Sequence, residues 1–145
     1  MKGAYKQFDQ KLFNQNDPKS RAVVKQYLSN NGIDVNDNAN KYGVDLVSEN
    51  GEVKIEVERR LVWKNEKFPF NEINLPERKA KFFKENNVSY AIVSEDYKRI
   101  GLINGKNIQE YITDANLKEN PNKFVGAGEM FYKIPRDKFK WVTLK

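Results

Sequence analysis

Residues 44–58 read VDLVSENGEVKIEVE and predict a β-hairpin, around which the rest of the chain can be arranged. An Asn-Gly dipeptide between two strand-like runs is the strongest short-range hairpin signal, because Asn and Gly accept the positive φ angles of tight turns. The second run alternates polar and apolar residues up to Glu58, as a half-buried strand does. A two-residue turn at Asn50-Gly51 places Asp45 directly across from Glu56.

The predicted register gathers three carboxylates on one face of the hairpin, those of Asp45, Glu56 and Glu58. Opposed residues of an antiparallel pair have Cβ atoms about 4.5–5.5 Å apart, so Asp45 and Glu56 are close enough to share one cation. Lys54 lies on the same face and is the nearest predicted counter-charge, although a divalent ion would relieve the repulsion better. The other face is predicted to point to the core and carries Val44, Leu46, Val53, Ile55 and Val57.

Around the hairpin, the sequence alternates helix-like and strand-like segments. It predicts helices near residues 19–30, 75–84 and 108–115, the first two with a proline at or beside the start. It predicts strands at residues 33–35, 88–94, 99–103, 130–134 and 139–143, and turns at residues 36–40 and 126–128. No repeat, linker or break in composition divides the chain, so we expect a single α/β domain over residues 1–145.

Aromatic residues supply most of the bulky material for a core. The chain has nine Phe, seven Tyr and two Trp, which chains too polar to fold usually lack. The residues predicted to be buried are Phe68, Phe70, Phe82, Phe83, Tyr90, Phe131 and Trp141.

The composition excludes several classes of chemistry. The chain contains no Cys and no His, which removes disulfides, thiolate and imidazole metal sites, and catalysis by a Cys or His residue. Any bound metal must therefore be a hard cation with oxygen ligands, such as Mg²⁺, Mn²⁺ or Ca²⁺. No apolar run approaches the roughly 20 residues of a membrane span, so we expect no membrane association and a cytoplasmic protein. The 20 Lys and 18 Asn residues are associated with an A/T-rich genome, which suggests the cytoplasm of a bacterial or phage-infected cell.

The net charge of +6 is concentrated in one part of the sequence. The segment from Arg59 to Lys84 contains eight basic residues and only three acidic ones. Such a cluster suits a surface that binds a polyanion, because neutralised phosphates release their condensed counterions. A solvated lysine-rich surface without a partner remains the alternative interpretation of the charge alone.

The hairpin motif resembles that of the PD-(D/E)XK nuclease superfamily. The matching residues are Tyr42-Gly43-Val44-Asp45-Leu46 and Glu56-Val57-Glu58, with ten residues between Asp45 and Glu56. The following Trp63, Phe68-Pro69-Phe70, Leu75-Pro76 and Arg78-Lys79 are similar to a stretch of its small, phage-type members. The resemblance, which covers roughly residues 19–94, implies a restriction-endonuclease-like core: a mixed central sheet with a strand hairpin, flanked by helices.

The resemblance also implies a metal site with Mg²⁺ or Mn²⁺. In such a site Asp45 and Glu56 bind the ion with help from the Val57 carbonyl, and Glu58 binds the ion or acts as general base. Two residues depart from the motif: Val44 stands at a frequent Pro position, and Glu58 replaces the catalytic Lys, giving Glu-x-Glu in place of Glu-x-Lys. The resemblance leaves room for a basic group from the second helix, with Lys79 as first choice and Arg78 as second.

The expected activity is metal-dependent endonucleolytic hydrolysis of phosphodiester bonds in duplex or branched DNA, by a monomer or a homodimer. The residues expected to hold nucleic acid are Arg59, Arg60, Trp63, Lys64, Arg78 and Lys81. Trp63 either stacks on a base or packs inside the protein. Two alternatives stay open: an inactive nucleic-acid-binding module on the same fold, and a phage factor whose basic face binds an acidic protein partner.

Overall fold

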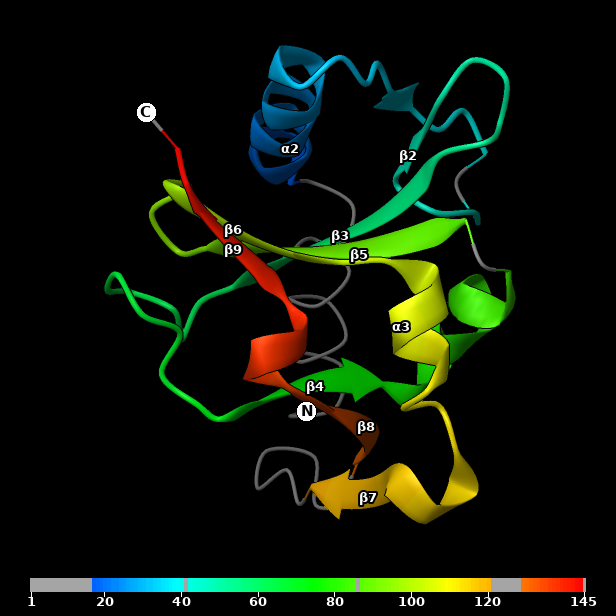
Figure 1. Cartoon of the computed structure of the whole chain (residues 1–145), viewed down its shortest axis with the longest axis vertical. Helices are drawn as coiled ribbons and strands as arrows, with labels where there is room; N and C mark the ends of the chain where they lie inside the picture. Colours follow the sequence, from blue (N-terminus) through cyan, green and yellow to red (C-terminus); the bar gives the residue numbers. More distant parts are fainter. Residues whose placement is uncertain (1–16, 41, 86, 121–128, 145) are drawn as a thin grey trace, which may run out of the picture.

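The computed structural model describes residues 17–40, 42–85, 87–120 and 129–144. Within these residues the chain forms a six-stranded mixed sheet, in the order β1-β2-β3-β5-β6-β9, and a three-stranded sheet, in the order β4-β8-β7. Figure 1 shows helix α2 (Pro18–Asn30) above the large sheet and the small sheet below it. The protein is therefore a mixed α/β structure, as the sequence predicts.

The strands of the large sheet are β1 (Asn36–Asp37), β2 (Leu46–Val47), β3 (Lys54–Arg60), β5 (Val88–Ser94), β6 (Arg99–Ile103) and β9 (Lys140–Thr143). Those of the small sheet are β4 (Glu72–Pro76), β7 (Leu117–Asn120) and β8 (Glu129–Pro135). The remaining helical elements are α3 (Gly105–Gln109) and the 3-10 helices η1 (Glu77–Lys84), η2 (Asp114–Asn116) and η3 (Arg136–Lys138). In this described part of the chain, no helix is both long and apolar enough to cross a membrane.

Helix α2 confirms the first predicted helix and begins one residue earlier. The side chain of Asp17 caps the helix by accepting a hydrogen bond from the Ser20 amide at 3.2 Å, and Pro18 occupies the first turn, where no amide is needed. The strand predicted at residues 33–35 is wrong. The Ile33 amide instead donates to the Leu28 carbonyl to close the helix, and the first strand is β1, within the segment predicted as a turn.

The predicted hairpin register is confirmed, since Leu46 pairs with Ile55 and Val47 with Lys54. The turn differs from the prediction: the Gly51 amide donates to the Ser48 carbonyl at 2.9 Å, so the turn is centred on Glu49-Asn50. Gly51 follows with a φ of +75°, a conformation that glycine adopts without steric cost.

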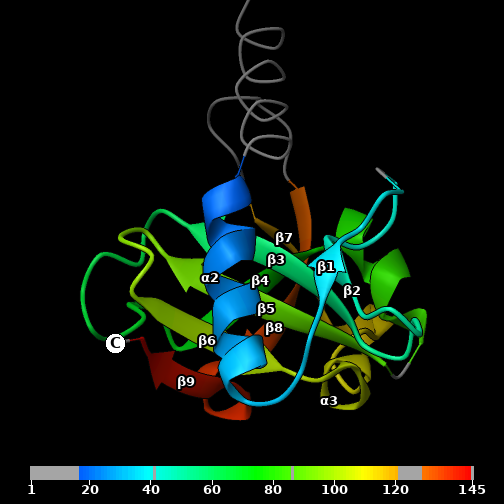
Figure 2. The same ribbon diagram turned by 90° about the horizontal axis from the view of Figure 1, so that it is seen from above.

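The two faces of the large sheet have separate cores. On one face α2 contributes Val24 and Leu28, which pack with Leu46, Ile55 and Val57 of the hairpin. Figure 2, seen from above, shows α2 lying across this face. Val44 belongs to the other core, with Trp63 and Tyr90, although the sequence analysis placed it with Leu46. The chain leaves the strand geometry before β2, so the alternation of faces does not extend back to Val44.

Strands β5 and β6 confirm the strands predicted at residues 88–94 and 99–103. β5 lies parallel to β3, with Glu56 beside Tyr90, and antiparallel to β6. β5 is buried along most of its length, in agreement with its nearly continuous apolar sequence.

The prediction of a helix at residues 75–84 is wrong for its first two residues. Leu75 and Pro76 end strand β4, which pairs with β8, and the helix starts at Glu77 in 3-10 form. The helix predicted at residues 108–115 is shorter and earlier, as α3. The two C-terminal strands form within one residue of their predicted starts, as β8 and β9, but β8 belongs to the second sheet, which the sequence analysis did not anticipate.

An aromatic cluster fills the space between the two sheets. Trp63 packs edge-on against Phe68 and Trp141, with ring centroids 5.8 and 5.3 Å away. Phe68, Phe83 and Tyr90 are buried as predicted, and Phe82, Phe131 and Trp141 are half-buried. Phe70 is 56% exposed, so the prediction of a core position is wrong there. The turn predicted at residues 126–128 lies outside the described residues.

Candidate active site

A cleft of about 630 Å³ opens beside the C-terminal half of β3. It brings together the start of α2, the loop before β2, strand β3, helix η1 and the start of β8. Its lining includes the predicted catalytic residues Asp45, Glu56, Glu58 and Lys79, and the basic residues Arg21, Arg59, Arg60, Arg78 and Lys81. The candidate site residues, which come from separate parts of the chain, therefore share one cavity.

Asp45 is held at the open edge of β3. β2 pairs only with Lys54 and Ile55 of β3, so the backbone of β3 beyond Ile55 is not paired with β2. There the Asp45 carboxylate accepts a hydrogen bond from the Val57 amide at 2.8 Å. The preceding loop is fixed by Asn38, whose side-chain amide donates to the Val44 carbonyl at 2.9 Å. Gly43 permits this arrangement, because a Cβ there would lie 2.6 Å from the Asn38 amide nitrogen.

Glu56 and Lys79 form a buried ion pair in the cleft. The Lys79 Nζ lies 3.0 Å from Glu56 Oε2. Lys79 is 7% exposed and Glu56 is 5% exposed. Burial raises the pKa of Glu56 to about 7; the nearby Asp45 charge adds to the rise, and the Lys79 ammonium only partly offsets it. Burial likewise raises the pKa of Asp45, against the opposing effects of the Val57 amide and Lys79.

Lys79 stays protonated in this setting. Burial alone would lower its pKa, but the charges of Glu58 and Glu56 outweigh that effect, and the pKa of Lys79 is raised. The ammonium lies 3.5 Å from Glu58 Oε2 and so bridges the two glutamates of β3. Lys54, expected to relieve the carboxylates, instead pairs with Glu85 at 3.2 Å, and Lys79 from η1 is the lysine that lies next to Glu56.

Glu58 is bound by three donors inside the protein. Arg60 lies 2.8 Å from its Oε1, the Tyr90 hydroxyl donates to the same oxygen, and Lys79 approaches the other. Burial would raise the pKa of Glu58, but Arg60, Lys79 and Tyr90 together hold it at about 2. Arg60 also donates to the Asn74 carbonyl at 2.6 Å and to the Tyr90 hydroxyl at 2.7 Å. The Glu58 carboxylate is therefore permanently ionised and already paired.

The net pKa is raised at two of the carboxyl groups, those of Asp45 and Glu56, and the charge of a bound cation would oppose this rise. The Val57 carbonyl points to the same strand edge as the Val57 amide, which contacts Asp45. In residues 17–40, 42–85, 87–120 and 129–144, no group of three acidic side chains is placed to hold an ion by itself. Glu58 is already paired within the protein, which leaves Asp45 and Glu56 as the candidate carboxylate ligands.

The predicted nucleic-acid-binding residues divide into two groups. Arg59, Arg78 and Lys81 line the cleft, and the last two are exposed. Arg60 also lines it, but its guanidinium is taken up by Glu58, Tyr90 and Asn74. Lys64 is exposed and does not line the cleft.

Trp63 is 1% exposed, so the prediction that it stacks on a base is wrong and the packing alternative is confirmed. Its partners are Phe68, from the segment before β4, and Trp141, in β9, and these two rings also stack on each other with centroids 5.8 Å apart.

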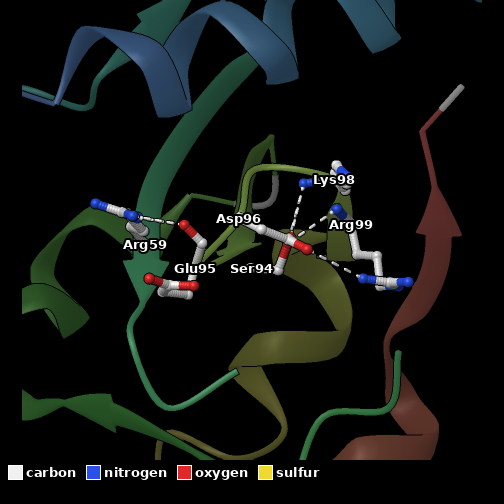
Figure 3. Close-up of polar contacts among 6 residues, drawn as sticks. All are labelled: Arg59, Ser94, Glu95, Asp96, Lys98 and Arg99. Atoms are coloured by element: carbon white, nitrogen blue, oxygen red, sulfur yellow. Dashed lines mark hydrogen bonds and ion pairs between the residues drawn. The ribbon is translucent and has the colours of Figure 1, made fainter. Parts of the chain in front are cut away.

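Arg59 is anchored at the far end of β3. Its guanidinium donates to the Glu95 carbonyl and lies over the Tyr97 ring at 4.2 Å. Figure 3 shows the hydrogen bond from Arg59 to Glu95 beside a second set of hydrogen bonds, in which Ser94 and Asp96 accept from the amides of the turn between β5 and β6. The turn thus fixes the side chain of a cleft residue.

The sequence analysis missed Arg21, Leu61 and Val62, which also line the cleft. Arg21 opposes the rise in the pKa of Asp45 and pairs with Asp37 at 3.3 Å. The only sequence signal for Arg21 was its place in the first turns of a helix. Leu61 and Val62 directly follow the acidic strand, and their position beside two basic residues was the signal that could have found them.

In comparisons of the chain with known proteins, no protein-family model matches it, and none of the curated proteins does.

The pKa of Glu56 predicts how metal binding depends on pH. The folded-state pKa of about 7 lies above the ordinary value of 4.5, so Mn²⁺ must displace a proton below pH 7. We expect the Mn²⁺ affinity to rise about tenfold per pH unit up to about pH 7 and then to level off. Calorimetric titration across roughly pH 5.5–8.5 checks this.

Glu56→Gln should remove this pH-dependent Mn²⁺ binding, whereas the control Glu66→Gln, at an exposed position outside the cleft, should not. A wild-type affinity that is independent of pH would contradict the assignment.

The pairing of Glu58 predicts a structural cost of removing it. Glu58→Gln leaves Arg60 without its counter-charge and should lower the free energy of unfolding by about 3 kcal/mol. Tyr90→Phe removes one donor and should lower it by about 1–2 kcal/mol. Urea denaturation measures both, with Tyr27→Phe on α2, outside this network, as the matched control for Tyr90→Phe. If Glu58→Gln costs no more than Glu85→Gln, the network does not stabilise the fold as described.

Proposed function

We propose that the protein is a metal-dependent endonuclease of the PD-(D/E)XK type that hydrolyses phosphodiester bonds in DNA. The observation that carries this proposal is the juxtaposition of Asp45, Glu56 and Lys79 in one cleft, beside basic side chains. Carboxylates that hold a hard cation, next to an ammonium and a cationic surface, suit attack of water on a phosphodiester.

The fold is in accord with a restriction-endonuclease-like core. Apart from β1 and β4, the chain runs through a helix, an antiparallel hairpin (β2–β3), a short helix and a strand (β5) parallel to β3, which is the order that the resemblance implies. β4 lies between β3 and η1 and belongs to the second sheet. The acidic residues lie on the hairpin and Lys79 lies on the helix between β3 and β5. This arrangement supports the proposal without depending on any single residue of the motif.

Asp45, Glu56 and the Val57 carbonyl are the groups that would hold Mg²⁺ or Mn²⁺. They fit a hard cation, because every donor is an oxygen and both carboxyl groups have raised pKa values that a positive charge would reverse. When bound, the ion supplies Lewis-acid polarisation of the phosphate and lowers the pKa of a water ligand.

We assign to Lys79 the part that the motif gives to the lysine replaced by Glu58. Its ammonium comes from η1 and reaches the same pair of glutamates, at 3.0 and 3.5 Å. Because the raised pKa keeps it protonated, Lys79 donates hydrogen bonds to negative charge that develops on the phosphate and does not act as a base. Glu58, with a pKa of about 2, is too weak a base for proton abstraction at neutral pH and instead orients Lys79.

The basic side chains of the cleft would hold the DNA backbone. Arg59, Arg78 and Lys81 line the cleft together with Arg21 from α2. Contacts of this kind carry no sequence information, and the affinity they give falls steeply as salt rises.

One observation favours the second candidate, an inactive nucleic-acid-binding module. Lys79 already contacts both Glu56 and Glu58, at 3.0 and 3.5 Å, so its ammonium occupies a place beside Glu56 that a metal ion would otherwise take. This candidate predicts DNA binding that is sensitive to salt and indifferent to Mg²⁺.

Cleavage of labelled DNA tests the proposal. Purified protein is incubated with duplex, branched and single-stranded DNA in Mn²⁺ or in EDTA. We expect cleavage in Mn²⁺ only, and a loss of at least about a hundredfold in rate for Asp45→Asn and for Glu56→Gln. The control Glu66→Gln should keep the wild-type rate. Cleavage that persists in Asp45→Asn would refute the assigned site, and binding to all substrates without any cleavage would favour the inactive module.

A further inference from the structure

Two aliphatic side chains lie exposed within the cleft. Leu61 and Val62 follow directly after β3 and are 46% and 53% exposed, and both line the cavity that holds Asp45 and Glu56. The other large hydrophobic residues that are strongly exposed in the described part of the chain are Ile33, Tyr42 and Phe70, and none of them lines this cavity.

The Leu61-Val62 turn is held firmly by its neighbours. The Trp63 amide donates to the Arg60 carbonyl at 3.1 Å, and the Trp63 carbonyl accepts from the Glu95 amide at 2.9 Å. The Trp63 side chain is fully packed behind the turn. The two aliphatic side chains are therefore presented from a fixed backbone, and they are not the tip of a long loop.

The surroundings of the turn indicate what covers these side chains. Arg59 on one side, and Arg78 and Lys81 from η1 on another, suit the phosphates of a nucleic acid strand. In an intact duplex the exposed apolar groups of DNA are mainly thymine methyls and deoxyribose carbons, whereas its largest apolar surfaces are the faces of the bases. Those faces are covered by stacking in an intact duplex and become accessible where a base is unstacked or unpaired.

The size of the cleft points the same way. A volume of about 630 Å³ lies within the range of about 300–1,000 Å³ typical of small-molecule pockets. A cavity of this size has room for an unstacked nucleotide.

We propose that Leu61 and Val62 contact an unstacked base next to the phosphate that is cleaved, so that the substrate is DNA with unpaired nucleotides, at a branch or in a single strand. The description of this DNA as a substrate rests on the proposed nuclease function. The contact between the two side chains and an unstacked base concerns DNA binding and can be tested without cleavage. Aliphatic side chains of this kind insert at base steps in other DNA-binding proteins and are compensated by the contacts that the distortion permits.

Equilibrium binding in EDTA tests the inference without cleavage. The probes are a fluorescein-labelled single strand, the duplex formed with its complement, and a branched DNA that contains the same strand. We expect the wild type to bind the single-stranded and branched probes at least about tenfold more tightly than the duplex. The double variant Leu61→Ser/Val62→Ser should lose about tenfold in affinity for those two probes and less than about twofold for the duplex.

The matched control is Ile33→Ser, an aliphatic residue with 38% exposure outside the cleft, which should leave all three affinities unchanged. A second readout is specific to base unstacking. A 2-aminopurine at the branch point should brighten when the wild type binds and should not brighten with the double variant.

Equal affinity of the wild type for duplex and unpaired DNA, or an unchanged preference in the double variant, would overturn the inference. Cleavage in Mn²⁺ on the same probes separates this outcome from failure of the proposed function. Cleavage of all probes with no effect of the double variant retains the nuclease and refutes the base contact. A preference for unpaired DNA that the double variant abolishes, without any cleavage, supports the base contact and refutes the nuclease.

Discussion

The ion pair between Lys79 and Glu56 is the interaction on which the rest of the cleft depends. Two glutamates of one strand point to the same face, and without a cation between them their charges would repel each other in a poorly solvated space. Lys79 supplies that cation from η1, which ties the helix to the sheet at this point. Lys79 contacts both glutamates, but their protonation differs: Glu58 is ionised at all ordinary pH values, whereas Glu56 titrates near pH 7.

The two glutamates of β3 thus have different environments in spite of their similar places in the sequence. Glu58 is surrounded by Arg60, Tyr90 and Lys79, so its charge is fully compensated within the protein. Glu56 has Lys79 on one side and the acidic Asp45 on the other, so part of its negative charge is left for an external cation. In the proposed mechanism this difference gives the two glutamates of β3 separate roles: Glu58 orients Lys79, whereas Glu56 binds the metal ion together with Asp45.

Much of the hairpin could be predicted because its signals are local. The turn residues and the alternation around Glu56 fix the register within a few residues, and the apolar run of β5 is long enough to identify a buried strand. Lys79 could be singled out only through the resemblance to a family that needs a basic group there. Its contacts with Glu56 and Glu58 are set by the position of η1, which no local pattern encodes.

The failures of the sequence analysis come from contacts between distant segments. β4 pairs with β8, more than fifty residues later, and that pairing turns Leu75 and Pro76 from a helix start into a strand end. Trp63 and Arg60 lie among basic residues and look exposed in the sequence, but Trp141 and Tyr90 enclose them from other strands. Leu61 and Val62 are the opposite case, since aliphatic residues next to a buried tryptophan would be expected in the core yet remain exposed in the cleft.

The most direct test of the account is the rate of Mn²⁺-dependent cleavage in Lys79→Met, measured together with the Mn²⁺ affinity of the same variant. Methionine keeps much of the side-chain volume and removes the charge. The account predicts a rate at least about a hundredfold lower, with Mn²⁺ bound at least as tightly as in the wild type, because Lys79 competes with the ion for Glu56. A variant that cleaves at the wild-type rate would contradict the central role of Lys79.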